Sequence, residues 1–279
     1  MPRHGYEHTS QADAYPCRGI PCGCPGGVSE SKPHRPGTLY GVGVGPGAPD
    51  LLTLRAQQIL RTSPVICLPT SAHGQSYAGS IIEHLLDHER QEVLLVSFPM
   101  VRDPQLALPA REQAVTLVLE RLQAGLSVAF ATEGDPLLYS TFGYLLEAVK
   151  QYSPDICVQV VPGISSITAA AASACLPLAA WDEGIAVIPA AHAVRRTGSG
   201  NLRQVLQLFE TVVLLKVHTV FDLVLDTLEE LNLVQHAIFV QRCSTDREEI
   251  VCDLSRLRKQ KLDYFSLVIV RKPYATSKP

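Results

Sequence analysis

The sequence predicts an α/β protein of two domains, with a mostly parallel sheet in the first and a mixed sheet in the second. From Thr38 onward, short β-rich runs alternate with amphipathic helical segments, which is typical of parallel sheets covered on both faces. Three glycine-containing turns follow predicted strands, and ligands of open α/β sheets bind at the carboxyl ends of strands. The last three predicted strands have little helix between them, which indicates antiparallel pairs.

The first predicted domain spans residues 38–161. Buried strands are expected where β-branched and apolar residues run together, and helices where apolar residues recur every three or four positions. The predicted strands are Thr38–Gly45, Val65–Leu68, Val93–Phe98, Ser127–Thr132 and Cys157–Val161. The predicted helices are Leu52–Leu60, Tyr77–His88, Pro109–Ala124 and Leu138–Val149.

The second predicted domain spans residues 162–273 and begins at Pro162-Gly163, which an alanine-rich helix follows as far as Ser173. Further strands are predicted at Ile185–Ile188, Val212–Val217, Ala237–Gln241, Ile250–Leu254 and Phe265–Val270. Further helices are predicted at Leu202–Phe209 and Val220–Leu231. Residues 274–279 are expected to be a tail.

Residues 1–37 are rich in Gly, Pro, His, Ser and Cys and have no apolar periodicity, so they are predicted to be a disordered tail. Three of the eight cysteines lie in this tail, at spacings that match no standard zinc site, and the other five are scattered. We therefore expect reduced thiols and no protein-bound metal.

Charge and hydropathy exclude several classes of protein. A net charge of −3 gives no reason to expect nucleic acid or an anionic membrane surface as a partner. The long uncharged stretch Ile156–Trp181 is interrupted by Pro162, Gly163 and Pro177, so it is interpreted as strand, turn and helix. With no apolar signal core at the N-terminus, the expected location is the cytoplasm.

The first of the three turns is Gly41–Gly47, at the end of the first predicted strand. A dinucleotide fingerprint needs glycine where this chain has Pro46, and no Lys-Ser/Thr pair follows, so NAD and P-loop chemistry are disfavoured. The glycines leave room for a ligand near the backbone, and the following helix can direct free N–H groups at it. A tight strand-to-helix turn without ligand explains the same residues.

The second and third turns are Thr132–Thr141 and Val161–Ser166. Asp135 fits a helix cap with Pro136 at the first helical position, and it fits equally a carboxylate that accepts hydrogen bonds from a ribose. Ser165 and Ser166 are predicted at a helix start, before small residues that permit close packing or close approach of a ligand.

Together the turns resemble the tetrapyrrole methylase family. The likeness covers Thr38 to Lys272 and rests on four stretches in order: GVGVGPGAPDLLTLRA, ATEGDPLLYST, VPGISSITAAAA and VVLLKVHT. Within the family, LPTSAHGQSYAGSII, VSFPMVRD and GDPLLYSTFGYL resemble the branch that methylates carbon 20 of the macrocycle.

The resemblance implies a homodimer of two-domain subunits that binds S-adenosylmethionine (SAM) between its domains. At the positions that match the family's motifs, Gly45 and Pro46 would line one side of the site, and Ser165 and Ser166 would contact the cofactor from the second domain. In this chain Ala48 stands where relatives often carry aspartate, which leaves only a backbone role there. The other cofactor-binding residues implied are Glu133, Gly134, Asp135, Leu138, Lys216, Val217, Arg242 and Cys243.

The reaction implied is methyl transfer from SAM to carbon 20 of precorrin-2 or of cobalt-factor II, in cobalamin biosynthesis. This reaction depends on alignment and exclusion of water and requires no catalytic triad. Tyr139 is the candidate residue beside the reacting carbon. The substrate carries eight carboxylates, for which the candidate partners are Arg102, Arg111, Arg195 and Arg196. The alternatives are methylation of another ring carbon, a diphthine synthase and a SAM-binding protein without activity.

Overall fold

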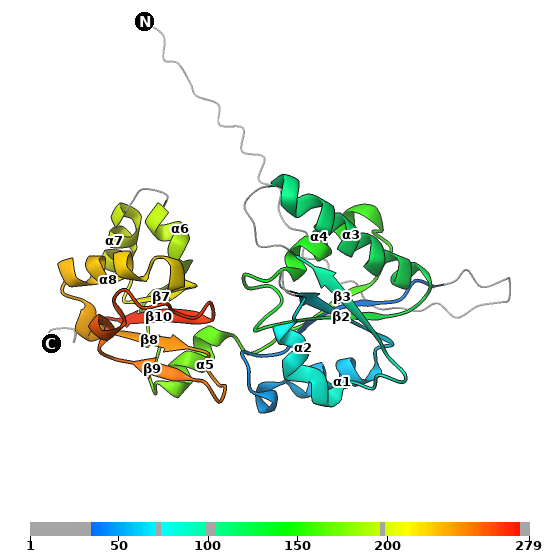
Figure 1. Ribbon diagram of the computed structural model, residues 1–279, viewed down its shortest axis with the longest axis horizontal. Coiled ribbons are helices and arrows are strands. Elements are labelled where there is room, and N and C mark those ends of the chain that lie inside the picture. The colour runs from blue at the N-terminus through cyan, green and yellow to red at the C-terminus, as the bar shows by residue number, and fades with distance from the viewer. Residues whose placement is uncertain (1–34, 71–73, 99–103, 196–198, 274–279) are drawn as a thin grey trace, which may run out of the picture. The chain divides into compact units, whose positions relative to one another are not determined.

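The computed structural model describes residues 35–70, 74–98, 104–195 and 199–273. In these residues ten strands form two five-stranded sheets (Figure 1). All but residues 35–37 of the predicted N-terminal tail, and the whole of the predicted tail 274–279, lie outside the described residues.

The first sheet has the strand order β3-β2-β4-β1-β5, and every neighbouring pair is parallel. Its strands are β1 (Leu39–Gly43), β2 (Val65–Thr70), β3 (Glu92–Ser97), β4 (Val128–Thr132) and β5 (Val158–Val161). The helices between them are α1 (Leu54–Thr62), α2 (Tyr77–Ile82), α3 (Pro104–Gln123) and α4 (Phe142–Tyr152), with single 3-10 turns at Pro49–Leu51 and Glu83–Leu85.

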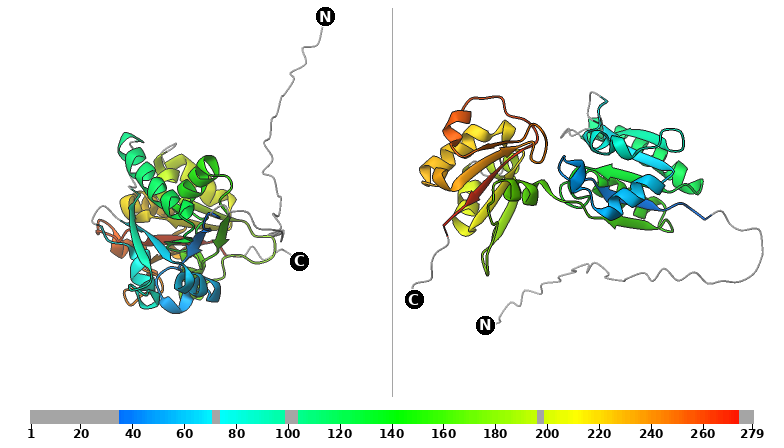
Figure 2. Two further views of the ribbon diagram at one scale, coloured as in Figure 1. Left: turned by 90° about the vertical axis from the view of Figure 1, so that its right-hand side faces the viewer. Right: turned by 90° about the horizontal axis from the view of Figure 1, so that it is seen from below.

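Helices cover the first sheet on both faces, which is why its central strands are continuous apolar runs. Every residue of β4 is buried. On one face, Phe130 of β4 packs against Phe142 of α4 and lies in the same core cluster as Val118 of α3. Helices α1 and α2 cover the other face (Figures 1 and 2). Their residues Leu60 and Ile81 belong to a second core cluster.

The second sheet has the order β6-β7-β10-β8-β9; β6 and β7 are parallel and the remaining neighbours antiparallel. This mixed sheet after a parallel one confirms the predicted fold class. Its strands are β6 (Ile185–Pro189), β7 (Thr211–Leu215), β8 (Ala237–Gln241), β9 (Glu249–Val251) and β10 (Ser266–Arg271). The helices are α5 (Ser166–Ser173), α6 (Ala190–Arg195), α7 (Ser199–Leu208) and α8 (Phe221–Glu230), with 3-10 turns at Val217–Thr219, Val234–His236 and Leu254–Leu257.

The two faces of the second sheet are also covered. Helices α6, α7 and α8 share one core cluster, which includes Leu206 and Leu228. On the opposite face, the small side chains Ala169–Ala171 of α5 pack with Val213 of β7 and Ile269 of β10. The small residues of α5 therefore serve close packing of a helix on a sheet. The boundary between residues 38–161 and 162–273 stays a prediction.

The structure corrects three predicted helices. Helix α4 begins at Phe142 rather than Leu138, α2 ends at Ile82, and α3 begins at Pro104, which places Pro109 inside it. The short helix α6 was not predicted, because six residues are too few to show a helical period. The later start of α4 means that Asp135 does not cap it.

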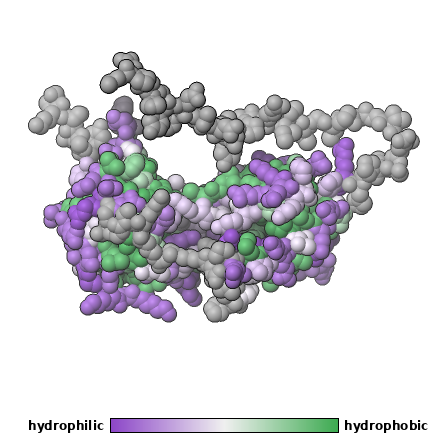
Figure 3. All heavy atoms as spheres, turned by 90° about the horizontal axis from the view of Figure 1, so that it is seen from above, coloured by the Kyte–Doolittle hydropathy of each residue, from purple (hydrophilic) through white to green (hydrophobic). Residues whose placement is uncertain are grey.

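Hydrophilic residues predominate on the face of the molecule seen in Figure 3, with apolar patches between them. No helix among the described residues is both long and apolar enough to cross a lipid bilayer.

Candidate functional site

The three glycine-containing turns meet where the strands of the first sheet reach their carboxyl-terminal ends. Strand β1 lies between β4 and β5, so the turns that follow these three parallel strands emerge side by side. The backbone N–H of Gly134 donates to the carbonyl oxygen of Gly45 at 2.8 Å. A Cβ atom on Gly163 would lie 2.1 Å from the Gly134 oxygen, and one on Gly43 2.5 Å from it. Only glycine permits this contact between the turns.

Asp135 joins the second turn to the third. Its Oδ2 accepts a hydrogen bond from the N–H of Gly163 at 3.1 Å, and its Oδ1 accepts one from Leu137 at 2.9 Å. Both carboxylate oxygens are thus used before the chain reaches α4. This explains why the predicted helix cap at Asp135 is wrong, although the residue does organise the turn.

Gly134 leaves space beside the joined turns. Its φ is +64°, in the left-handed region that favours glycine, and a Cβ there would have its nearest neighbours, Ile164 O and Ser165 Cα, at 4.0 Å. The second and third turns therefore leave room at a backbone that a ligand can approach. This opening fits a ligand held by main-chain groups.

Ser165 and Ser166 lie at the start of α5, where they were expected. The Ser165 hydroxyl accepts a hydrogen bond from the N–H of Ile167 at 3.2 Å and so caps the helix. The carbonyl oxygen of Ser166 accepts a weak hydrogen bond from the Sγ of Cys243, 3.8 Å away. The third turn is thereby connected to the end of β8.

Lys216 and Val217 follow β7, the second strand of the mixed sheet. Lys216 has a left-handed backbone with φ +55°, and its N–H donates to Ser266 at 3.0 Å. Its Nζ lies 5.4 Å from the centre of the Tyr264 ring. Val217 is fully buried and packs in the core beside helices α6, α7 and α8.

The turn after β8, here called the braced turn, contains Arg242, Ser244 and Thr245. Its backbone is strained, and several hydrogen bonds hold it in place. Arg242 and Ser244 have φ of +47° and +63°, a conformation that costs a non-glycine residue about 1–2 kcal/mol. The hydroxyl group of Thr245 donates a hydrogen bond to the carbonyl oxygen of Arg242 at 2.7 Å. The N–H of Arg242 donates one to the carbonyl oxygen of Phe265 at 2.8 Å. Backbone strain that the surroundings hold in place is typical of functional sites.

The braced turn touches the first glycine turn. The backbone N–H of Ala48 donates a hydrogen bond to Ser244 Oγ at 3.2 Å, so Ala48 contributes to this contact through its backbone. A Cβ on Gly47 would lie 2.4 Å from the Thr245 methyl group, which shows how closely the two segments pack. A pocket of about 350 Å³ opens here, lined by Gly47, Ala48, Pro49, Tyr77, Ser80, Ile81, Ser244, Thr245 and Asp246.

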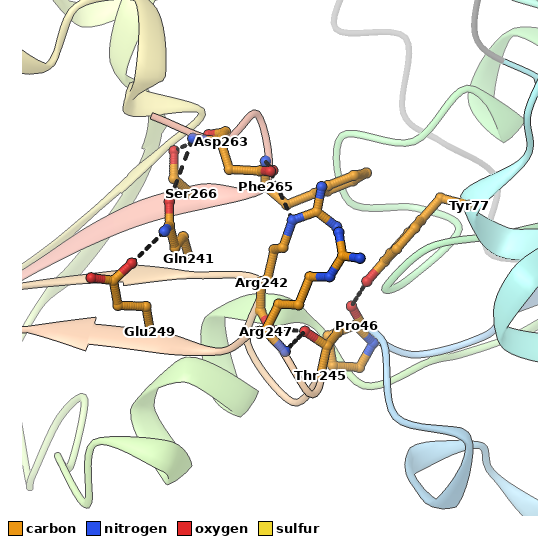
Figure 4. Close-up of polar contacts among 10 residues, drawn as sticks. All are labelled: Pro46, Tyr77, Gln241, Arg242, Thr245, Arg247, Glu249, Asp263, Phe265 and Ser266. Carbon is orange, nitrogen blue, oxygen red and sulfur yellow. Dashed lines mark hydrogen bonds and ion pairs between the residues drawn. The ribbon is translucent and has the colours of Figure 1, made fainter. Parts of the chain in front are cut away.

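Tyr77 is a site residue that the sequence analysis did not find. Its ring stacks on Phe265 with the centroids 4.4 Å apart, and its hydroxyl donates to the Pro46 carbonyl at 3.5 Å (Figure 4). The guanidinium group of Arg242 lies 5.8 Å from the centre of the Phe265 ring. Its Nε donates a hydrogen bond to Asp263 Oδ2 at 2.7 Å. Only the predicted helix start at Tyr77 was visible in the sequence.

Burial dominates the electrostatics of the site. Desolvation raises the pKa of Glu133, while backbone N–H groups of Glu133 and Ala78 and the charge of Lys216 oppose the rise. Desolvation also raises the pKa of Tyr77, which Arg242 counteracts. Burial raises the pKa of Cys243 to about 11, so this thiol is neutral.

The other predicted residues lie apart from the joined turns or make other contacts. The Tyr139 hydroxyl donates to the Val187 carbonyl of β6 at 3.0 Å, and Leu138 is exposed. Arg111 packs over the Tyr144 ring of α4 at 3.9 Å, a structural contact between two helices. Arg195 ends α6, but its side chain is outside what is described, as are Arg102 and Arg196 altogether.

The arrangement favours binding and alignment of a ligand by main-chain groups. Left-handed non-glycine residues recur around it, at Tyr139, Lys216, Arg242 and Ser244. Within the described ranges no three His, Cys, Asp or Glu side chains are grouped so that they could hold a metal ion.

Comparison with known proteins finds relatives that are similar to this chain in sequence and in fold. Residues 38–258 match the family of tetrapyrrole (corrin/porphyrin) methylases. The cobalt-precorrin-2 C(20)-methyltransferase of Salmonella typhimurium is 31% identical over 85% of this chain and 98% of its own length. The precorrin-2 C(20)-methyltransferase of a Sinorhizobium species is 28% identical over 84% of this chain and 95% of its own.

A solved structure has the same fold. It is the uroporphyrin-III C-methyltransferase of Thermus thermophilus, crystallised with S-adenosyl homocysteine. The TM-score is 0.60 at 24% identity, over 84% of this chain and 97% of that one. With a match over residues 38–258 and a relative at 31% identity along its whole length, the chain belongs to the tetrapyrrole methylase family.

Proposed function

We propose that this protein transfers a methyl group from SAM to carbon 20 of precorrin-2 or of cobalt-factor II, in cobalamin biosynthesis. The observation that carries the proposal is the 31% identity to a cobalt-precorrin-2 C(20)-methyltransferase along 98% of that enzyme. A relative named for the metal-free substrate is similar at 28%, so both forms of the substrate remain in the proposal.

The joined glycine turns are the proposed SAM site. Gly134 offers an open backbone, and Gly45 and Pro46 form the opposite side, with Tyr77 bonded to Pro46. The cofactor supplies a methyl group already activated for transfer. The other residues proposed to hold it are Glu133, Asp135, Leu138, Ser165, Ser166, Lys216, Val217, Arg242 and Cys243.

The protein's own contribution is alignment and the exclusion of water. Asp135 keeps the second turn against Gly163, so the open face of Gly134 stays directed at the ligand. We retain Tyr139 as the candidate beside the reacting carbon; its hydroxyl bond to Val187 would hold the ring in one position. Arg111, packed on Tyr144, is a weaker candidate for substrate carboxylates than the sequence suggested.

The proposed assembly is a homodimer in the cytoplasm, with the tetrapyrrole as its partner and with no nucleic acid or membrane bound. Sedimentation velocity at several protein concentrations tests the dimer: a single species of twice the chain mass of 30.3 kDa is expected.

The reaction is tested by incubating the protein with SAM and either precorrin-2 or cobalt-factor II. Mass spectrometry should show one added methyl group, and carbon assignment should place it at carbon 20. The substrate that turns over decides between the metal-free and cobalt forms. A methyl group at another carbon would favour a sibling enzyme, and SAM binding without transfer to either tetrapyrrole would reject the proposal.

A further inference from the structure

Three cationic side chains lie in the described segments that follow β7 and β8. Two of them have partners, because Lys216 lies over Tyr264 and Arg242 is paired with Asp263. The third is Arg247, an exposed residue between β8 and β9. Within the part of the chain that the structure describes, its backbone N–H is bonded to Thr245, while its guanidinium group makes no ion pair or hydrogen bond.

The backbone that carries Arg247 is held in place. The N–H of Arg247 donates a hydrogen bond to Thr245 Oγ1 at 3.2 Å. The same hydroxyl group donates one to the carbonyl oxygen of Arg242, whose backbone is strained. Ser244, two residues from Arg242, is bonded to the first glycine turn through Ala48. In Figure 4 the Arg247 side chain leaves this turn toward the side where Pro46 and Tyr77 lie. A surface arginine on a loose loop would have none of these constraints.

Most acidic groups of the same turn are already engaged. Glu248 accepts hydrogen bonds from the Ser244 N–H and from the hydroxyl of Ser173, and Glu249 accepts one from Gln241. Asp246 is the exception, since it lines the pocket next to Arg247 without a hydrogen bond or ion pair among the described residues. The turn thus presents one uncompensated cation and one uncompensated anion.

We infer that Arg247 binds a carboxylate side chain of the tetrapyrrole, an inference that rests on the proposed function. A guanidinium group donates two parallel hydrogen bonds to a carboxylate, and because its planar fork is rigid, less side-chain freedom is lost for each hydrogen bond formed. Asp246 repels the same carboxylate and limits how tightly the substrate is held. As the candidate partner of a substrate carboxylate, Arg247 replaces Arg111, whose guanidinium group packs on the Tyr144 ring.

Titration with cobalt-factor II in the absence of SAM, followed by absorbance, measures this contact without turnover. R247Q should raise the Kd of cobalt-factor II about fivefold, the size of one exposed ion pair. The Kd of R247K should lie between those of R247Q and the wild type, because lysine cannot donate two parallel hydrogen bonds to one carboxylate. D246N should lower the Kd. The difference between R247Q and the wild type should shrink at high salt.

Two controls show whether a loss of affinity arises from the guanidinium group of Arg247 itself. R90Q removes an arginine paired with Asp87 in the turn before β3, at the opposite edge of the first sheet, and should leave the Kd unchanged. The Kd of SAM, measured by calorimetry, should be equal in wild type and R247Q. If R247Q binds cobalt-factor II as tightly as the wild type, the assignment of Arg247 is wrong while the proposed function stands. If the wild type binds SAM but no tetrapyrrole, the proposed function fails and the inference with it.

Discussion

Single residues of the site act largely through burial and through backbone contacts. Asp135 uses both carboxylate oxygens on neighbouring N–H groups, and Ser165 uses its hydroxyl to cap α5. Ala48, which has no polar side chain, contacts Ser244 through its backbone N–H. Side-chain identity at these positions therefore serves mainly to shape the backbone of the turns.

Glu133 allows a test of how burial affects stability. Its pKa is raised in the folded protein, so folding favours the neutral form and destabilises the charged one. The stability that this group contributes is complete below the ordinary glutamate pKa and is lost as the pH rises through the raised value. E133Q should therefore increase the free energy of unfolding at neutral pH, where the wild type has to bury a charged carboxylate.

Urea denaturation of E133Q and the wild type at acid and at neutral pH measures this difference. The two proteins should be equally stable in acid and should diverge as the pH rises. E112Q, on the exposed side of α3, is the matched control and should show no pH-dependent difference. A loss of stability in E133Q that is larger at neutral than at acid pH would mean that hydrogen bonds from Ala78 and Glu133 outweigh desolvation.

At the scale of elements, strand order creates the site. Because β4, β1 and β5 are neighbours and parallel, three turns that lie far apart in the sequence reach the same edge. The turns then fit so closely that the Gly134 carbonyl oxygen occupies the space of a side chain on Gly43 or Gly163. The turn after β8 completes the arrangement from the second sheet, through Ala48 and Ser244.

G163A tests this packing directly. The added methyl group would overlap the Gly134 oxygen, a backbone atom that cannot move alone, so the free energy of unfolding should fall by about 2–3 kcal/mol. The matched change is G143A in α4, where the new Cβ meets no atom within 4 Å and alanine favours the helix. G143A should raise the stability by up to about 1 kcal/mol. Equal effects of both changes in thermal denaturation would contradict this account.

At the scale of the whole molecule, the two sheets meet the same ligand in the proposed function. The described residues belong to one compact unit, in which Tyr77 after β2 stacks on Phe265 before β10. A ligand that binds only the folded chain stabilises it by an amount that grows with the logarithm of the ligand concentration relative to its Kd.

S-adenosyl homocysteine at about 100 times its Kd should raise the free energy of unfolding by about 2.7 kcal/mol. Denaturation with and without this compound measures the shift, and NAD is the matched control. NAD should have no effect, because Pro46 replaces the glycine that a dinucleotide fold needs at that point. Stabilisation by NAD but not by S-adenosyl homocysteine would contradict the proposed cofactor.

Much of the fold could be predicted because its signals are local. A strand such as β4 is a short apolar run between turn residues, and a helix such as α8 repeats apolar residues with the helical period. Boundaries failed where tertiary contacts compete with local rules, as at Asp135, whose bond to Gly163 replaces a helix cap. The resemblance to a known family then supplied the cofactor, the substrate and most of the candidate residues.

The sequence by itself determined the fold class, the glycine-containing turns and the family, because hydrophobic period and turn chemistry act between residues close in the chain. Only the tertiary structure decided that Tyr77 stacks on Phe265 and that Arg111 packs on Tyr144. These contacts join segments far apart in the sequence. Their occurrence depends on the strand order and on how closely the turns pack, and neither leaves a local pattern in the sequence.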